Sequence, residues 1–464
     1  MKIVVNNLLG LLETIAPALR LFLKKYVKTI MFFMLQFCSV YAVGQSFESY
    51  LANAKQGDVV AMSYVGNCYI NGTNVPKDEK QGFEWCYKAA LKGNLDGMAM
   101  IGSCYTTGTG VDVNLKQGFE WSLKAAQGGH IGAVYNVACN YMTGKGVIKN
   151  EKIGFNWFLK AAMAGNATAE CQIGYCYSKG IGVDKNEQEG LYWYKKAAQH
   201  GEAISQYNLG CIYSEGILVD LDNKEAFKWF LKSAQQGFGQ AQRCIGYMYY
   251  NGVCIKKDLT AAFKWFQKAA EGGDVLAMRF LGSCYCSGEG VEKNENIGFE
   301  WYLRAAKLGD ETAMWQIGYS YLNGIGVVKD ERKGFEWIKK TAEKNFSYAQ
   351  NTLGNCYYWG QGTEQDYKQA FYWYEKAASQ KLMVSYNMLA YCYVKGQGVR
   401  KNVDKAFEMI DNAISSEPAN LDYIDTKGEL YSIINEKEKA LEMYDIIMKT
   451  DPFYFKNVVL PLNA

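Results

Sequence analysis

Residues 278–310, MRFLGSCYCSGEGVEKNENIGFEWYLRAAKLGD, contain two short patterns that could carry chemistry. Gly288 and Gly290 form a GxG, and glycine-rich loops bind phosphate through their backbone N–H groups. Cys284 and Cys286 lie two residues apart, and neighbouring thiols can bind a metal or undergo redox exchange. Either role would require that the pattern be confined to this stretch of the chain.

The same pattern instead recurs along most of the chain with a period of 36 residues. A tyrosine recurs in all ten copies, from Tyr69 to Tyr393, and a glycine does so from Gly72 to Gly396. Met409 takes the tenth place of a tryptophan series that consists of Trp85, Trp121, Trp157, Trp193, Trp229, Trp265, Trp301, Trp337 and Trp373. Self-similarity at a fixed period of this length is typical of repeat proteins, so residues 278–310 belong to a tenfold array.

The repetition argues against both chemical readings. GxG occurs in seven of the ten turns, as expected of glycines that end helices and not of a phosphate site. The Cys284 position is also cysteine in five other copies, and it is Asn140, Ile212, Met248 or Ser320 in the rest, as expected of a small core site.

Known enzyme signatures are also absent from the sequence. It contains no CxxC, SxxK, GxSxG, HExxH or Walker-type GK[ST], so we expect no enzymatic activity, no cofactor and no metal. His130 and His200 fall between repeats, where we expect solvated loop residues. A carboxylate pair assembled by the fold would escape such a motif search and stays open.

Each copy predicts two helices. Residues 61–72 place apolar or small residues at helical spacing, and Gly72 ends this first helix with a left-handed cap. Asp78 begins the second helix, because its position is Asp or Asn in all ten copies, as an N-cap requires. Position 82 is always Gly or Ala, as expected where two helices cross closely. One such pair cannot bury its own apolar face, so we expect an all-α, right-handed α-solenoid of ten stacked 36-residue repeats.

The sequence divides into five segments. Residues 1–44 resemble an export signal, since Lys24, Lys25 and Lys28 precede an apolar run that is short for a membrane span; an uncleaved anchor is the alternative. Residues 45–57 match the second helix of a repeat, 58–417 hold the ten repeats, 418–452 form a capping unit, and 453–464 form a tail. With 50 basic and 47 acidic residues the chain is nearly neutral, so we expect no nucleic acid partner.

The pattern L-G-x-x-Y-x-x-G-x-G-V followed by W-x-x-K-A-A, present as LGSCYCSGEGV and WYLRAA, resembles the Sel-1-like repeat family over residues 46–417. Residues 418–452 resemble a tetratricopeptide repeat through Gly428, Tyr431, Ala440, Tyr444 and Pro452. The family resemblance implies a binding scaffold or adaptor, and exported bacterial members are linked to host or envelope interactions. One branch of the family pairs cysteines at the second alanine of K-A-A, but alanine stands there in this chain, at Ala90, Ala126, Ala162 and Ala198. The disulfide pattern of that branch is therefore not implied.

If the first helix of each repeat lines a concave groove, as in tetratricopeptide relatives, five positions per copy face a partner. These positions differ among the copies and carry Tyr, Trp and Arg, the residue types that dominate binding hot spots. The candidate partner-binding residues are Tyr135, Tyr175, Tyr207, Arg243, Tyr247, Arg279, Trp315, Tyr319, Asn351, Trp359 and Tyr391. Arg243 and Arg279 would suit an acidic or C-terminal carboxylate group of a peptide. The alternative is that some of the aromatic side chains pack between neighbouring helices.

The groove positions also include Cys139, Cys171, Cys211 and Cys286, which we expect to be accessible. Taken with the resemblance, these patterns predict a non-enzymatic scaffold that binds a protein or peptide in the groove. Two alternatives are an envelope-associated hydrolase carried on the same solenoid and a purely structural spacer. We expect an exported protein, periplasmic or secreted, with peripheral or no membrane contact after cleavage; an N-terminally anchored protein is the alternative.

Overall fold

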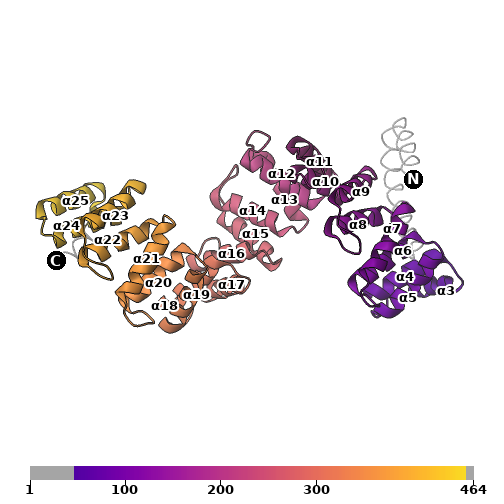
Figure 1. Cartoon of the computed structure of the whole chain (residues 1–464), viewed down its shortest axis with the longest axis horizontal. Helices are drawn as coiled ribbons and strands as arrows, with labels where there is room; N and C mark the ends of the chain where they lie inside the picture. Colours follow the sequence, from indigo (N-terminus) through magenta and orange to yellow (C-terminus); the bar gives the residue numbers. More distant parts are fainter. Residues whose placement is uncertain (1–45, 456–464) are drawn as a thin grey trace, which may run out of the picture. The chain divides into compact units, whose positions relative to one another are not determined.

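The computed structural model describes residues 46–455, which form consecutive helices joined by short turns (Figure 1). The prediction of an all-α solenoid built from consecutive helix pairs is confirmed. The predicted export signal, residues 1–44, lies outside the described residues, as does most of the predicted tail. No helix within the described range has the length and apolar character needed to span a membrane.

The chain forms two compact units that divide between His200 and Gly201. Unit 1 contains α3 (Phe47–Lys55), α4 (Val59–Asn71), α5 (Glu79–Leu91), α6 (Leu95–Thr107), α7 (Leu115–Gln127), α8 (Ile131–Thr143), α9 (Glu151–Met163), α10 (Ala167–Lys179) and α11 (Glu187–Gln199). The lone helix α3 packs against α4, and the other helices form pairs. We call the first helix of a pair helix A and the second helix B.

Unit 2 continues the pairs and adds the capping helices. It contains α12 (Ala203–Glu215), α13 (Asn223–Gln235), α14 (Gly239–Asn251), α15 (Leu259–Glu271), α16 (Val275–Ser287), α17 (Glu295–Lys307), α18 (Glu311–Asn323), α19 (Glu331–Glu343), α20 (Ser347–Trp359), α21 (Tyr367–Ser379), α22 (Met383–Lys395) and α23 (Val403–Ser416). The capping helices are α24 (Leu421–Ile433), α25 (Lys437–Thr450) and the single turn α26 (Pro452–Tyr454).

The helix ends confirm the predicted caps. The Asp78 carboxylate accepts a hydrogen bond from the Gln81 backbone N–H at 2.9 Å, which begins helix B of the first copy. In the GxG of residues 288–290, Gly288 ends α16 at a φ of 78°. Gly290 has a φ of 75°, and a Cβ atom there would lie 2.0 Å from the Leu259 carbonyl oxygen of the preceding copy. Both glycines therefore serve the turn and its close approach to the neighbouring helix.

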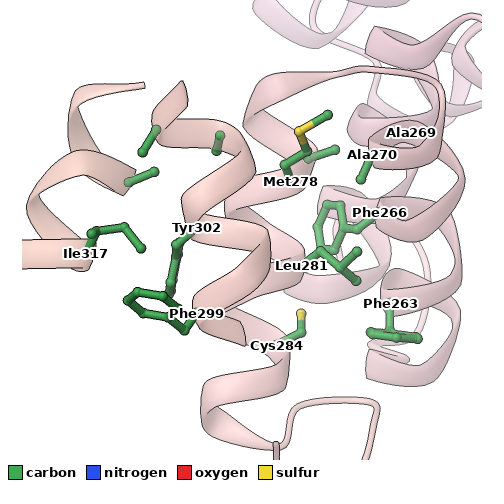
Figure 2. Packing of buried hydrophobic residues seen from close by; sticks show 14 of the residues in the cluster. Phe263, Phe266, Ala269, Ala270, Met278, Leu281, Cys284, Phe299, Tyr302 and Ile317 are labelled. Carbon is green, nitrogen blue, oxygen red and sulfur yellow. The ribbon is translucent and has the colours of Figure 1, made fainter. Parts of the chain in front are cut away.

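The core of unit 2 shows the packing that the repeat produces (Figure 2). Phe266 and Leu281 are 1% and 0% exposed, and Cys284 lies in the same cluster at 2%. Burial raises the pKa of the Cys284 thiol to about 11, so the thiol stays protonated at neutral pH. A Cβ on Gly298 would come within 2.9 Å of the Gly282 carbonyl oxygen, which confirms the close helix crossing predicted at this position.

Aromatic contacts link successive copies and explain the repeated Phe, Tyr and Trp residues. Phe263 on α15 meets Tyr285 on α16 edge to face, with ring centroids 5.3 Å apart, and the equivalent pair recurs in both units. Trp265 lies under the Lys268 ammonium at 4.7 Å, one turn along helix B. Because such contacts are each worth about 0.5–1.5 kcal/mol, the array is stabilised by many small, equivalent terms.

Candidate binding pockets

The candidate partner-binding residues all lie on helix A of their repeats. In unit 1, Tyr135 is on α8 and Tyr175 on α10. In unit 2, they are Tyr207 on α12, Arg243 and Tyr247 on α14, Arg279 on α16, Trp315 and Tyr319 on α18, Asn351 and Trp359 on α20, and Tyr391 on α22. Their role in partner binding stays a prediction, but their surroundings differ in ways that matter for it.

Four of these residues come together in unit 2. A cavity of about 510 Å³ lies among α12, α13, α14 and α16, and it is lined by Tyr207, Arg243, Tyr247 and Arg279. Its further lining residues include Cys211, Glu215, Phe230, Met248, Leu276 and Phe280. The volume falls within the range of about 300–1,000 Å³ that is typical of ligand sites. The cavity therefore combines apolar walls with two guanidinium groups.

Each of the two arginines is held by the N-cap aspartate of the next helix A. The Arg243 Nε–H donates to both carboxylate oxygens of Asp274, at 3.1 and 3.2 Å, and Asp274 also caps α16. Arg279 is held less tightly, because its Nε lies 3.8 Å from Asp310 and is buried without a hydrogen-bond partner. A guanidinium has five N–H groups, so the contact to Asp274 occupies only one side of Arg243. These aspartates orient the arginines, and the remaining N–H groups can serve an anion.

The polar groups of the cavity favour binding over nucleophilic chemistry. Burial raises the pKa of the Cys244 thiol to about 12, and burial is also the main cause that raises the pKa of Cys211. Burial followed by the neighbouring Cys211 raises the pKa of Tyr207. All three groups are thus protonated at neutral pH. Within residues 46–455, no group of His, Cys, Asp and Glu side chains is arranged to hold a metal ion.

Trp315 belongs to an aromatic cluster between α18 and α20. Its indole N–H donates to the Thr352 hydroxyl at 2.9 Å, and its ring lies 5.7 Å from Tyr348 and 5.9 Å from Tyr319. The half-buried indole therefore packs between neighbouring helices, as the alternative interpretation proposed. Tyr319 and Tyr348 remain 41% and 51% exposed at the edge of this cluster. Trp359, farther along α20, is 68% exposed.

Three residues expected at the groove surface lie elsewhere. Asn351 is buried, and its side-chain oxygen accepts a hydrogen bond from the Ser385 hydroxyl of the next repeat. Tyr391 is half-buried and donates to Glu429 of the capping unit. Cys171 is only 4% exposed, so the expectation that it is accessible was wrong; among the described cysteines the exposed one is Cys254, in a turn. In each of the first two cases, the following repeat supplies a polar partner that covers the residue.

The two histidines lie between helices, as expected, and His200 is exposed, but both imidazoles also have specific protein partners. His130 Nδ1 accepts a hydrogen bond from the Ala133 backbone N–H at 3.0 Å and thereby caps α8. His130 Nε2 lies 3.2 Å from an Asp96 carboxylate oxygen. His200 caps the C-terminus of α11, and its Nδ1 lies 2.7 Å from Glu170. Both imidazoles are thus committed to structural contacts within unit 1.

Glu170 is a fully buried carboxylate that the sequence analysis missed. One Glu170 oxygen contacts His200, and the other lies 3.1 Å from Lys196 Nζ. This distance is short enough for an ion pair, but the two groups are not aligned for a hydrogen bond. Glutamine occupies the same repeat position in other copies and bonds to a glutamine 30 residues later, as in the pairs Gln206–Gln236 and Gln350–Gln380. The recurrence identifies Glu170–His200 as the charged version of a structural contact. The one signal in the sequence was an acidic residue at a core position of helix A.

The Sel1 repeat model matches the chain ten times, over residues 59–94, 95–130, 131–166, 167–202, 203–238, 239–274, 275–310, 312–346, 347–382 and 384–415. One similar solved structure is c5321, a protective antigen present in uropathogenic Escherichia coli strains and displaying an SLR fold. It is 31% identical, with a TM-score of 0.68 and 88% of each chain covered. A Sel1 repeat protein from Oxalobacter formigenes is 28% identical over 53% of this chain and 99% of that one, with a TM-score of 0.49. No curated protein matches the chain. The chain therefore belongs to the Sel1 repeat family, whose scaffolds typically mediate protein interactions.

Proposed function

We propose that this chain is a non-enzymatic scaffold that binds a protein or peptide on its helix A face, with the unit 2 cavity as the anchoring site. The observation that carries the proposal is the convergence of Tyr207, Arg243, Tyr247 and Arg279 on one cavity of about 510 Å³. Aromatic and arginine side chains in a largely desolvated pocket are the typical composition of a binding hot spot.

The two arginines of the cavity indicate which chemical group of a peptide it binds. Arg243 and Arg279 contribute two guanidinium groups, each already contacted on one side by an aspartate, and Glu215 is the one carboxylate among the described residues that line the cavity. The remaining guanidinium N–H groups are the donors available to a ligand. Guanidinium groups pair with carboxylates through charge-assisted hydrogen bonds. The cavity therefore suits a peptide residue that presents an acidic side chain or a C-terminal carboxylate beside an apolar group.

The alternatives receive less support from the same residues. A hydrolase would need an activated nucleophile or a base, but the cavity thiols have raised pKa values, the His130 imidazole caps α8, and the His200 imidazole contacts Glu170. A spacer would not need Tyr247 and Trp359 to expose 51% and 68% of their surface. We also propose, from the sequence of residues 1–44, that the protein acts after export; mass spectrometry of the mature N-terminus tests this, with cleavage expected before Gln45.

A crosslinking pull-down from native cells tests the binding proposal. Arg279→Gln is the informative variant, because Arg279 is held more loosely than Arg243 and its loss disturbs the fold less. Arg332→Gln is the charge-matched control, since Arg332 is 88% exposed at the start of α19. We expect a specific protein captured by wild type and by the control to be depleted with Arg279→Gln, with equal helix content by circular dichroism. Equal capture by all three chains would contradict the proposed site.

A further inference from the structure

Unit 1 contains a second cavity with the same construction as the anchoring cavity of unit 2. It has a volume of about 290 Å³ and lies among α8, α9 and α10. Ten residues line it, and each lies 72 positions, two repeat lengths, before a residue that lines the unit 2 cavity. Tyr135, Cys139, Phe158 and Tyr175 have the same residue type at both places. The two cavities are therefore formed by equivalent positions of the repeat, one in each unit.

The residues that alternate between copies explain why the cavity forms there. Cys139 is small and leaves space on its helix. Tyr175 occupies the equivalent position in the next copy, and its larger side chain lines that space. Phe158 also lines the cavity, with its ring 5.4 Å from the Tyr135 ring. One copy earlier, Ser122 stands in place of Phe158, and the equivalent space is smaller, about 210 Å³, and has no aromatic residue among the described residues that line it. An apolar, aromatic pocket thus arises from this particular combination of side chains.

The two cavities differ in charge. The Arg243 position corresponds in unit 1 to Cys171, which is buried and does not line the cavity. No arginine or lysine is among the described residues that line the unit 1 cavity, and Glu151 is its single carboxylate. Glu151 is already paired with Lys149 at 2.7 Å. A ligand that carries a carboxylate would find no cation in this cavity, whereas an uncharged ring or alkyl group would meet matching walls.

We propose that the unit 1 cavity is a second binding site, which takes a neutral aromatic or aliphatic side chain of a protein partner. The inference rests on the proposed function in that it assumes a polypeptide ligand, but it concerns a different cavity and a different ligand group. The chain then has two sites of similar construction: one in unit 2 whose two guanidinium groups suit a carboxylate-bearing residue, and one in unit 1 without a cation that suits an apolar residue.

Each cavity has a cysteine at the equivalent position, so ligand binding at each site can be measured separately through the alkylation rate of its thiol. Cys139 and Cys211 are half-buried in their cavities, and Cys254 is an exposed reference. The full chain is alkylated with N-ethylmaleimide at about pH 8.5, where thiol groups react measurably, and the rate at each cysteine is followed by peptide mass spectrometry. The probes are N-acetylphenylalanine amide, which is neutral, and N-acetylphenylalanine, which carries a carboxylate.

We expect the neutral probe to slow alkylation of Cys139 at least about threefold while Cys254 reacts unchanged, since a bound ring covers the thiol. The carboxylate probe should protect Cys211 more strongly than Cys139. In Tyr175→Ser, which copies the serine at Ser103 and Ser283 of other repeats, protection of Cys139 should be lost and protection of Cys211 retained. Tyr175 is 46% exposed, so this variant should keep its fold, which circular dichroism checks.

The outcomes distinguish the two proposals. Alkylation of Cys139 at the same rate with and without the neutral probe would overturn the second site, whatever happens at Cys211. Protection of Cys139 that persists in Tyr175→Ser would also overturn it, because the probe would then be bound elsewhere. Protection of Cys139 without any protection of Cys211 would support the second site and count against the anchoring cavity of unit 2.

Discussion

The contact between Glu170 and His200 gives a quantitative test of how the repeats are held together. Glu170 is fully buried, and His200 Nδ1 lies 2.7 Å from one of its oxygens. His200→Ala removes the hydrogen-bonded partner but leaves Lys196 at 3.1 Å. A buried charge left wholly unpaired costs about 3–5 kcal/mol. Because Lys196 still offsets part of the charge, we expect His200→Ala to lower the free energy of unfolding by about 2 kcal/mol.

The double-mutant cycle with Glu170→Ala isolates this interaction. Once the carboxylate is gone, the half-exposed His200 has no buried charge to compensate, so His200→Ala should then cost about 0.5 kcal/mol or less. The neutral contact Gln206–Gln236 is the matched control, and Gln236→Ala should cost about 1 kcal/mol. Replacing both Glu170 and His200 by glutamine should restore most of the stability, since a glutamine pair already occurs at these positions in unit 2.

Urea unfolding followed by circular dichroism gives the overall change. Amide hydrogen exchange on peptides from α10 and α11 locates it, which is necessary because long repeat arrays do not always unfold in two states. An equal cost of His200→Ala in wild type and in the Glu170→Ala variant would refute the assigned coupling. So would a double-glutamine variant no more stable than His200→Ala.

Four further predictions concern other parts of the fold. Burial, followed by the charge of Glu429, raises the pKa of Asp425 to about 6, above its value in the unfolded chain. The folded state therefore binds this proton more tightly than the unfolded state. The capping unit should become about 1–2 kcal/mol more stable as the pH falls from about 6 to 4. Asp425→Asn should abolish that dependence in urea titrations at the two pH values. Gly290→Ala should cost at least about 2 kcal/mol by thermal unfolding, because φ is 75° and the added Cβ meets a backbone oxygen. Conversely Leu218→Gly, at a φ of 64°, should stabilise the chain by about 0.5–1 kcal/mol in the same assay. Phe266→Ala, at 1% exposure, should cost about 3–5 kcal/mol, measured by urea unfolding.

The repeat, the helix ends and the close helix crossings could be predicted because they depend on local rules. Asp78 and its equivalents act on the next few backbone N–H groups, and Gly72 needs only its own left-handed conformation. Such requirements recur with every copy and are visible in one sequence. The same reasoning accounts for the GxG at Gly288 as a turn that ends α16.

The cavities could not be predicted, because an empty space depends on three side chains from different helices. The pocket is formed by the combination of Cys139, Phe158 and Tyr175. None of these residues is unusual when it is compared only with the residues at the same position of the other repeats. The direction of a polar residue also depends on the next copy: Asn351 turns inward because Ser385 is there to bond it. The contact of Glu170 could not be predicted either, because its partner His200 lies 30 residues later, after another helix.

The most direct test of the binding account is the affinity of the captured partner for variants of the unit 2 cavity. The dissociation constant is measured by calorimetry for wild type, for Arg279→Gln and Tyr247→Ser together, and for the exposed control Arg332→Gln. Loss of an anchoring arginine and aromatic residue should weaken binding at least about tenfold, whereas the control should stay within about twofold of wild type. Equal affinity of all three chains would contradict the assignment of the unit 2 cavity as the anchoring site.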